Sequence, residues 1–110
     1  MKPRISIQLY TLREEAKLGL ASVLERLGRI GYVGVEPAGL HDLSPEAFKR
    51  CIANAGLVVS SGHVALPKPD AAAEVLDQQE AIGNKDLVVA MLPSDWFTDA
   101  DGVRRCADKL

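Results

Sequence analysis

Five side chains that can donate, accept or transfer protons lie near the ends of apolar segments of this sequence. Gln8 and Tyr10 close the segment "ISIQLY", Glu36 closes "YVGVE", and Ser61 and His63 close "LVVSSGH". Strict alternation of side chains along an extended chain places these residues on the polar face of each segment. A carboxylate beside an imidazole can form a polar pocket and can serve as a base in proton transfer.

Three of these residues also have a purely structural interpretation. Glu36 precedes a proline-containing turn and could be the solvated end of a strand. A lone histidine such as His63 is commonly satisfied by a neighbour in a core or on a surface, and Tyr10 could fill the mouth of a barrel. Gly62 leaves room for close packing beside His63. The placement of Glu36 and His63 on adjacent strands favours a pocket over these alternatives.

The elements that must position these residues repeat along the chain. Gly31, Gly56 and Gly83 each close a helical pattern, and each is followed within a few residues by a β-rich run. This is the pattern of a repeated βα unit. It predicts strands at residues 5–10, 32–36, 57–63 and 86–92.

Helices are predicted between these strands from apolar residues at helical spacing. The first spans roughly residues 18–30, and the second follows Ser44, which can cap its free N–H groups, and Pro45, which suits the first helical position. The third begins at Asp70 and runs toward Gly83. The fourth begins near Asp99 and stays in phase to the end of the sequence, so the chain is expected to be truncated inside this helix.

The alternating order of strands and helices requires a parallel sheet, because helical crossovers join parallel neighbours. An open doubly wound sheet would have strands that are apolar on both sides, whereas a (β/α)8 barrel has helices on one face and an interior on the other. Polar residues on one face of the first three strands favour the barrel. The predicted fold class is therefore α/β, a parallel (βα)4 portion of a TIM barrel, in one partial domain over residues 1–110.

Composition and charge exclude several classes of function. The chain is 47% hydrophobic and 25% charged, and its 13 basic and 15 acidic residues give a net charge of −2. These charges are scattered, so no nucleic-acid or membrane partner is expected. The longest apolar run, residues 87–93, is too short to span a bilayer, and no signal-peptide pattern is present, which predicts a cytoplasmic protein. Cys51 and Cys106 occupy apolar helical positions and are expected to be buried free thiols.

In order and spacing, the segments "ISIQLYTLRE", "LGRIGYVGVEPAG", "AGLVVSSGHVAL" and "DADGVRRCADKL" resemble the amino-terminal part of the sugar phosphate isomerase/epimerase family, the xylose isomerase-like TIM barrels. The resemblance covers the whole chain. It implies isomerisation, epimerisation or a related proton transfer on a small polyhydroxy carbonyl substrate. It also implies a divalent metal cofactor (Mn²⁺, Mg²⁺ or Zn²⁺) at the carboxyl rim. Substrate-binding positions are implied at Gln8, Tyr10, Glu36 and His63, whereas the metal ligands belong to later strands and none is expected here.

A complete barrel of this kind needs about 250 residues. Residues 1–110 are therefore expected to form the amino-terminal half of a metal-dependent isomerase or epimerase that is inactive alone, so whether this chain is itself an enzyme stays open. A second hypothesis is a non-catalytic half barrel that forms a homo-oligomer, because its first and fourth strands would be open edges in the absence of a carboxyl-terminal half. A third is a metal-dependent abasic-site endonuclease fragment, a class that uses rim histidines for zinc. The absence of a basic surface argues against it.

Overall fold

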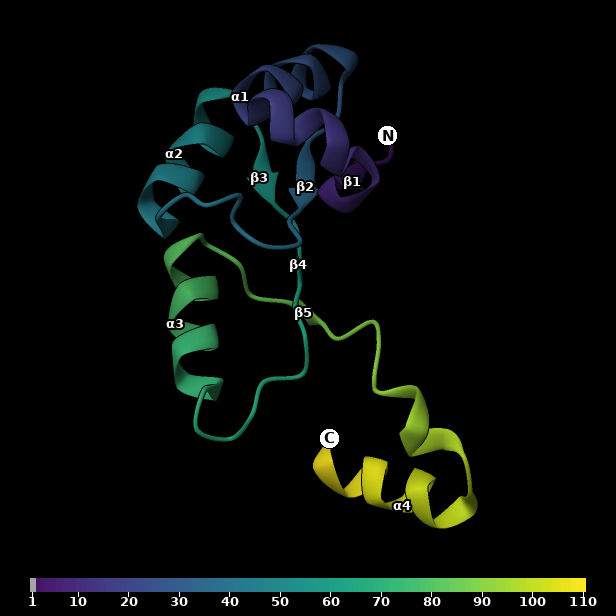
Figure 1. Cartoon of the computed structure of the whole chain (residues 1–110). Coiled ribbons are helices and arrows are strands. Elements are labelled where there is room, and N and C mark those ends of the chain that lie inside the picture. Colours follow the sequence, from purple (N-terminus) through teal and green to yellow (C-terminus); the bar gives the residue numbers. More distant parts are fainter. Residues whose placement is uncertain (1) are drawn as a thin grey trace.

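A computed structural model describes residues 2–110 as parallel strands alternating with helices (Figure 1). The order of strands and helices confirms the prediction. In chain order the elements are β1 (Ser6–Gln8), η1 (Leu9–Leu12), α1 (Arg13–Ile30), β2 (Gly34–Glu36), α2 (Pro45–Asn54), β3 (Val58–Val59), β4 (Gly62–His63), α3 (Ala72–Ala81), β5 (Leu87–Val88), η2 (Ser94–Phe97) and α4 (Ala100–Lys109).

The strands pair in the order in which they follow along the chain. β1 pairs with β2, with Gln8 opposite Glu36, and β2 pairs with β3. β4 pairs with β5, and a bridge between Ala38 and His63 connects this second sheet to the chain that continues from β2. All of these pairings are parallel. Successive strands of a parallel barrel are arranged in the same way.

One apolar core lies between the strands and the helices α1 and α2. Ile7, Val35 and Val59 pack into it from the sheet. From the helices it receives Leu24 and Phe48, both fully buried. Burial of each large apolar side chain contributes about 1.5–3 kcal/mol, so this face of the sheet holds the helices. The opposite face of the same strands carries the polar side chains of Gln8 and Glu36, together with the exposed Val58.

Of the two helices that cover this core, α2 begins where the sequence predicts and α1 begins earlier. In α2, the Ser44 hydroxyl accepts a hydrogen bond from the Ala47 N–H at 3.1 Å, and Pro45 occupies the first position, as predicted. Helix α1 begins at Arg13 rather than near residue 18. The helix is kinked at Gly19, whose backbone angles are extended (φ 171°, ψ 93°). The apolar residues therefore recur at regular helical spacing only after this kink.

The strands are shorter than predicted. The segment 5–10 is a strand only to Gln8, because the next residues turn into η1, and the segment 86–92 pairs only through β5. The segment 57–63 divides into β3 and β4. The third helix begins at Ala72 rather than Asp70. Helical spacing places Leu76 on its inner side together with Val75, Gln79 and Ile82, but Leu76 is 56% exposed.

The third strand, which comprises residues 58–63 and therefore β3 and β4, contains one extra residue. Up to Ser60, alternate backbone N–H groups donate to the β2 segment, the last at 3.0 Å. In a regular ladder the Gly62 N–H would donate next to that side. Instead the His63 N–H does so, to the Pro37 carbonyl at 2.9 Å, and the Gly62 N–H donates to the neighbouring segment at 2.8 Å. The irregularity is a β-bulge.

The bulge reverses which side chains face the helices. Before it, Val59 packs in the core and Val58 is 51% exposed. After it, Gly62 lies against α3 while His63 points to the opposite face. Unbroken alternation predicts that Val58 faces the helices and that Val59 faces away. That expectation is wrong, because it assumes one regular alternation over the whole strand. The bulge reverses the alternation between Ser60 and Gly62.

The fourth βα unit is packed differently from the first three. Helix α4 lies on η2, and Figure 1 shows both standing apart from the sheet and the other helices. The Asp99 carboxylate caps α4 by accepting from the Gly102 N–H at 2.6 Å, and the Lys109 ammonium lies 4.7 Å from the Trp96 ring centroid. Both cysteines are free, as expected. Cys106 is buried in this unit, whereas Cys51 of α2 is half-buried.

We expect Gly62→Ala to destabilise the fold. A Cβ at this position would lie 2.2 Å from Gln79 Oε1 and 2.5 Å from Asn84 Nδ2, two buried groups that are hydrogen-bonded to each other at 2.8 Å. Separating them costs about 1–3 kcal/mol. Urea denaturation followed by circular dichroism measures the loss. Gly19→Ala is the matched control, because its Cβ would meet only the Ser22 Cβ, at 3.9 Å. Equal stability of the two variants would contradict the packing described.

Candidate functional site

The carboxyl ends of β1, β2 and β4 bring four polar side chains together. Gln8 is the last residue of β1 and Glu36 the last of β2, and the register sets them side by side. Ser61 and His63 come from the third strand, at and beyond its bulge. All four are half-buried. We call this set, Gln8, Glu36, Ser61 and His63, the rim cluster.

Glu36 accepts two hydrogen bonds within the rim cluster. Gln8 Nε2 donates to Glu36 Oε1 at 2.7 Å, and the Ser61 hydroxyl donates to Glu36 Oε2. The same Gln8 nitrogen lies 2.7 Å from His63 Nδ1. Gln8 therefore links the carboxylate to the imidazole, and both oxygens of Glu36 have a protein partner.

From the contact between Gln8 and His63 we infer that this face of the sheet is concave. Their strands lie on either side of β2, and the flanking strands of a flat sheet would be about 9–10 Å apart. A separation of 2.7 Å between side-chain nitrogens is reached more easily when the outer strands curl toward each other. The same face is crowded at Gly34, where a Cβ would lie 2.5 Å from Ser6 Oγ and 2.9 Å from the Val58 carbonyl oxygen.

The bulge decides which residues of the third strand join the rim cluster. Without the bulge, Ser60 and Gly62 would lie on the same face as Val58, away from the helices. His63 would then lie on the same face as Val59 and point into the helix layer. Alternation in the sequence places Ser61 on the interior face. It gives no signal that Ser61 bonds to Glu36, because this contact depends on the shifted register.

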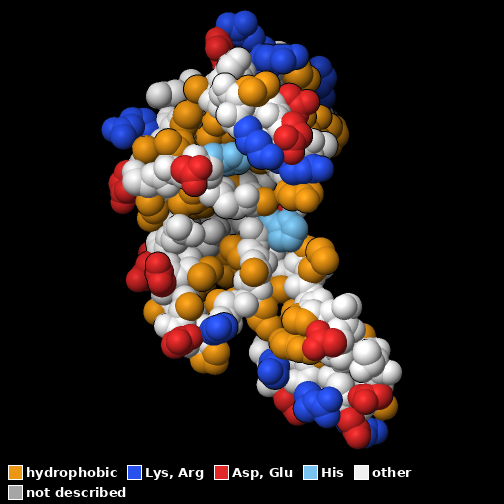
Figure 2. Space-filling model, in the orientation of Figure 1, with side chains coloured by type: hydrophobic (Ala, Val, Ile, Leu, Met, Phe, Trp, Pro, Cys, Tyr) orange, Lys and Arg blue, Asp and Glu red, His pale blue; other side chains and the backbone are white. Residues whose placement is uncertain are grey.

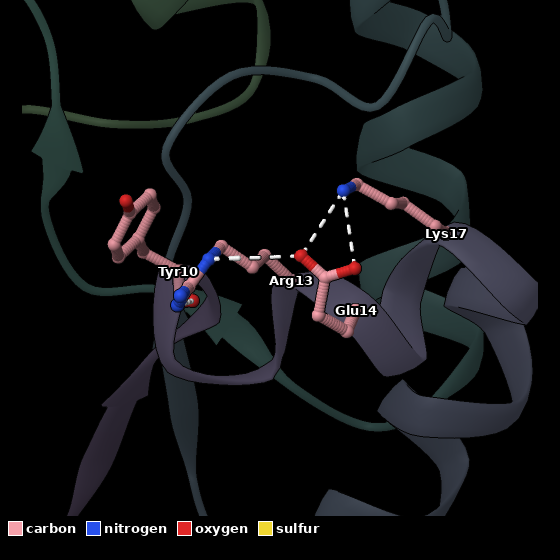
Figure 3. A network of polar contacts seen from close by, with 4 residues as sticks. All are labelled: Tyr10, Arg13, Glu14 and Lys17. Atoms are coloured by element: carbon pink, nitrogen blue, oxygen red, sulfur yellow. Dashed lines mark hydrogen bonds and ion pairs between the residues drawn. The ribbon is translucent and has the colours of Figure 1, made fainter.

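Tyr10, the fourth residue expected in the pocket, lies outside the rim cluster. It is part of η1 rather than of β1 and is 55% exposed. The Arg13 guanidinium lies 4.4 Å from its ring centroid and donates to its carbonyl at 2.9 Å. Figure 3 shows that Arg13 also forms an ion pair with Glu14, which in turn pairs with Lys17 at 3.0 Å. These pairs are exposed, so they stabilise the fold little.

The structure resembles part of a known enzyme. It matches the crystal structure of a sugar phosphate isomerase/epimerase from Parabacteroides distasonis with a TM-score of 0.80 and 19% sequence identity. The match covers 99% of this chain and 45% of that chain, so this chain spans less than half of its length. No protein-family model and no curated protein matches the sequence. The fold of this chain, parallel strands alternating with helices, therefore matches part of a TIM-barrel structure.

The residues described do not form a metal site. Within residues 2–110, no group of three or more His, Cys, Asp and Glu side chains is placed to hold a metal ion. A catalytic zinc, for comparison, takes three protein ligands. Glu36 and His63 alone do not meet that requirement. The expectation that the metal ligands lie elsewhere is not tested by this chain.

Two further surface features bear on binding. A groove of about 910 Å³ is lined by residues that come after His63 in the sequence, and no residue of the rim cluster lines it. Its lining residues include Ala65, Leu66, Met91, Leu92 and Trp96. Figure 2 shows acidic and basic side chains interspersed on the face in view. No helix within residues 2–110 is long and apolar enough to cross a membrane.

Proposed function

We propose that this chain forms the substrate-binding portion of a sugar phosphate isomerase or epimerase. The observation that carries the proposal is the rim cluster, three strand ends that converge through Glu36 on the concave face. Parallel barrels place their chemistry at this rim. The match to part of a sugar phosphate isomerase/epimerase supports the substrate class.

The rim cluster fits the oxygen-rich surface of a polyhydroxy carbonyl compound. It combines a carboxylate, which accepts hydrogen bonds from hydroxyls, with hydroxyl, amide and imidazole groups, which can donate to them. Removal of a proton next to a carbonyl needs a positioned base and a group that stabilises the developing oxyanion. We propose that Glu36 and His63 bind and orient the substrate. A divalent metal of such an enzyme would be held by residues outside this chain.

Titration of the labelled chain with a ketohexose phosphate, followed by amide NMR, tests the proposal. We expect saturable shifts at Gln8, Glu36, Ser61 and His63, with a Kd on the order of 1–10 mM, because only part of the barrel is present to form contacts. Inorganic phosphate and the unphosphorylated sugar are separate arms. They show whether the phosphate or the hydroxyls are recognised.

Two variants and one control make this result specific. Glu36→Ala and His63→Ala should each weaken binding about tenfold, since each removes a hydrogen bond worth about 1.4 kcal/mol. His41→Ala is the matched control, because His41 lies outside the rim cluster. It is in the loop after β2 and stacks on Phe48 of α2, with ring centroids 6.4 Å apart. Shifts confined to other residues, or equal loss in all three variants, would refute the proposed site.

We further propose that the concave face is covered by additional βα units, which a second copy supplies when the chain is alone. Val58 on this face is 51% exposed, and Leu87 and Val88 of the last strand are 40% and 38% exposed. Open strand edges with exposed apolar side chains favour pairing with another chain. Pairing of two copies is compatible both with the half-barrel hypothesis and with substrate binding at the rim cluster.

Sedimentation velocity tests this pairing. We expect the wild-type chain to form dimers and Val58→Asp to shift them toward monomer, because a carboxylate buried at the interface is costly. Leu18→Asp is the control, since Leu18 is 93% exposed in α1 and belongs to neither the concave face nor the last strand. A well-folded wild-type monomer at all concentrations would contradict the proposal.

A further inference from the structure

The protons of the rim cluster can be assigned from Glu36 outward. An ionised carboxylate accepts hydrogen bonds and donates none. The Ser61 hydroxyl therefore donates to Glu36 Oε2, and the group that lies 2.7 Å from Glu36 Oε1 must also be a donor. This requirement fixes how the Gln8 amide is turned.

Gln8 presents its NH₂ group, and not its carbonyl, to both neighbours. The reverse orientation would bring an amide oxygen to 2.7 Å from a carboxylate oxygen, two acceptors with no proton between them. An amide NH₂ has two protons. One goes to Glu36, and the second is available to His63 Nδ1, which lies 2.7 Å from the same nitrogen.

His63 Nδ1 must then accept a hydrogen bond. A neutral imidazole has one protonated and one unprotonated nitrogen, and the partner of one nitrogen sets the state of the other. We infer that Gln8, oriented by Glu36, is a positioning residue that fixes His63 as the Nε2–H tautomer. Within residues 2–110, Nε2 makes no hydrogen bond, so its N–H is free to donate to a ligand.

This assignment limits what His63 can bind. An Nε2–H group donates to a carbonyl, hydroxyl or phosphate oxygen and has no lone pair for a metal ion. Histidines that bind zinc usually show the opposite arrangement, in which the second nitrogen donates to a carboxylate or carbonyl. The choice of an oxygen ligand rests on the function proposed above. The tautomer argues against the abasic-site endonuclease hypothesis, which needs rim histidines on zinc.

Exchanging the donor at Gln8 for an acceptor tests the inference. In Gln8→Glu, a carboxylate replaces the amide beside Nδ1, and its repulsion from Glu36 favours the imidazole as its partner, so we expect the main tautomer of His63 to change from Nε2–H to Nδ1–H. Two-bond proton–nitrogen NMR spectra report both nitrogens, and about pH 9 keeps imidazole neutral. His41 is the internal reference and should not change. A ring not governed by residue 8 would keep the same tautomer in both proteins.

Zinc supplies a second readout on the same two proteins. The wild-type His63 Nε2 resonance should not respond to Zn²⁺, whereas in Gln8→Glu the unprotonated Nε2 should bind Zn²⁺ and its resonance should shift. If Gln8→Glu does not fold, Glu36→Gln serves instead, because it releases the Gln8 amide and should give a mixture of tautomers.

An Nδ1–H tautomer in the wild type would overturn the inference. So would the same tautomer in the wild type and in every folded variant. These spectra contain no sugar phosphate. Failure of the ligand titration would therefore refute the proposed function and leave the tautomer assignment standing, and the reverse also holds.

Discussion

The one-residue bulge in the third strand is the constraint on which the site depends. It changes the strand's hydrogen bonding so that Gly62 donates to one neighbour and His63 to the other. As a result, Gly62 faces α3, where the Gln79 and Asn84 side chains leave no room for a Cβ, and His63 faces the concave side. Packing of α3 and placement of the imidazole are thus two consequences of the same local irregularity.

Glu36 organises the polar side of the sheet in the way that the apolar core organises the other side. A half-buried carboxylate needs donors, and it has one from β1 and one from the third strand. These two hydrogen bonds join the strands that flank β2, in keeping with the inferred curvature of the sheet. The crowded position of Gly34 at the base of the concave face fits that curvature. The polar cluster is therefore part of the fold as well as a candidate binding site.

The sequence predicted the parts of this arrangement that follow from regular geometry. Gln8 and Glu36 end regularly paired strands, so alternation alone places them side by side. Ser44 and Pro45 mark the start of α2 through chemistry local to the helix end. Tyr10 and Val59 could not be placed in this way. Tyr10 lies in η1, into which the chain turns directly after Gln8. Val59 and His63 are separated by a bulge, which depends on hydrogen bonds to two neighbouring segments of the folded chain.

A double-mutant cycle between Gln8 and His63 tests most directly whether the concave face joins strands on either side of β2. Gln8→Ala, His63→Ala and the double variant are compared by urea denaturation, with Gln8 and His41 as the control pair. The contact at 2.7 Å predicts a coupling of about 0.5–1.5 kcal/mol for the first pair and none for the second. A coupling within about 0.3 kcal/mol of zero for Gln8 and His63 would contradict the account.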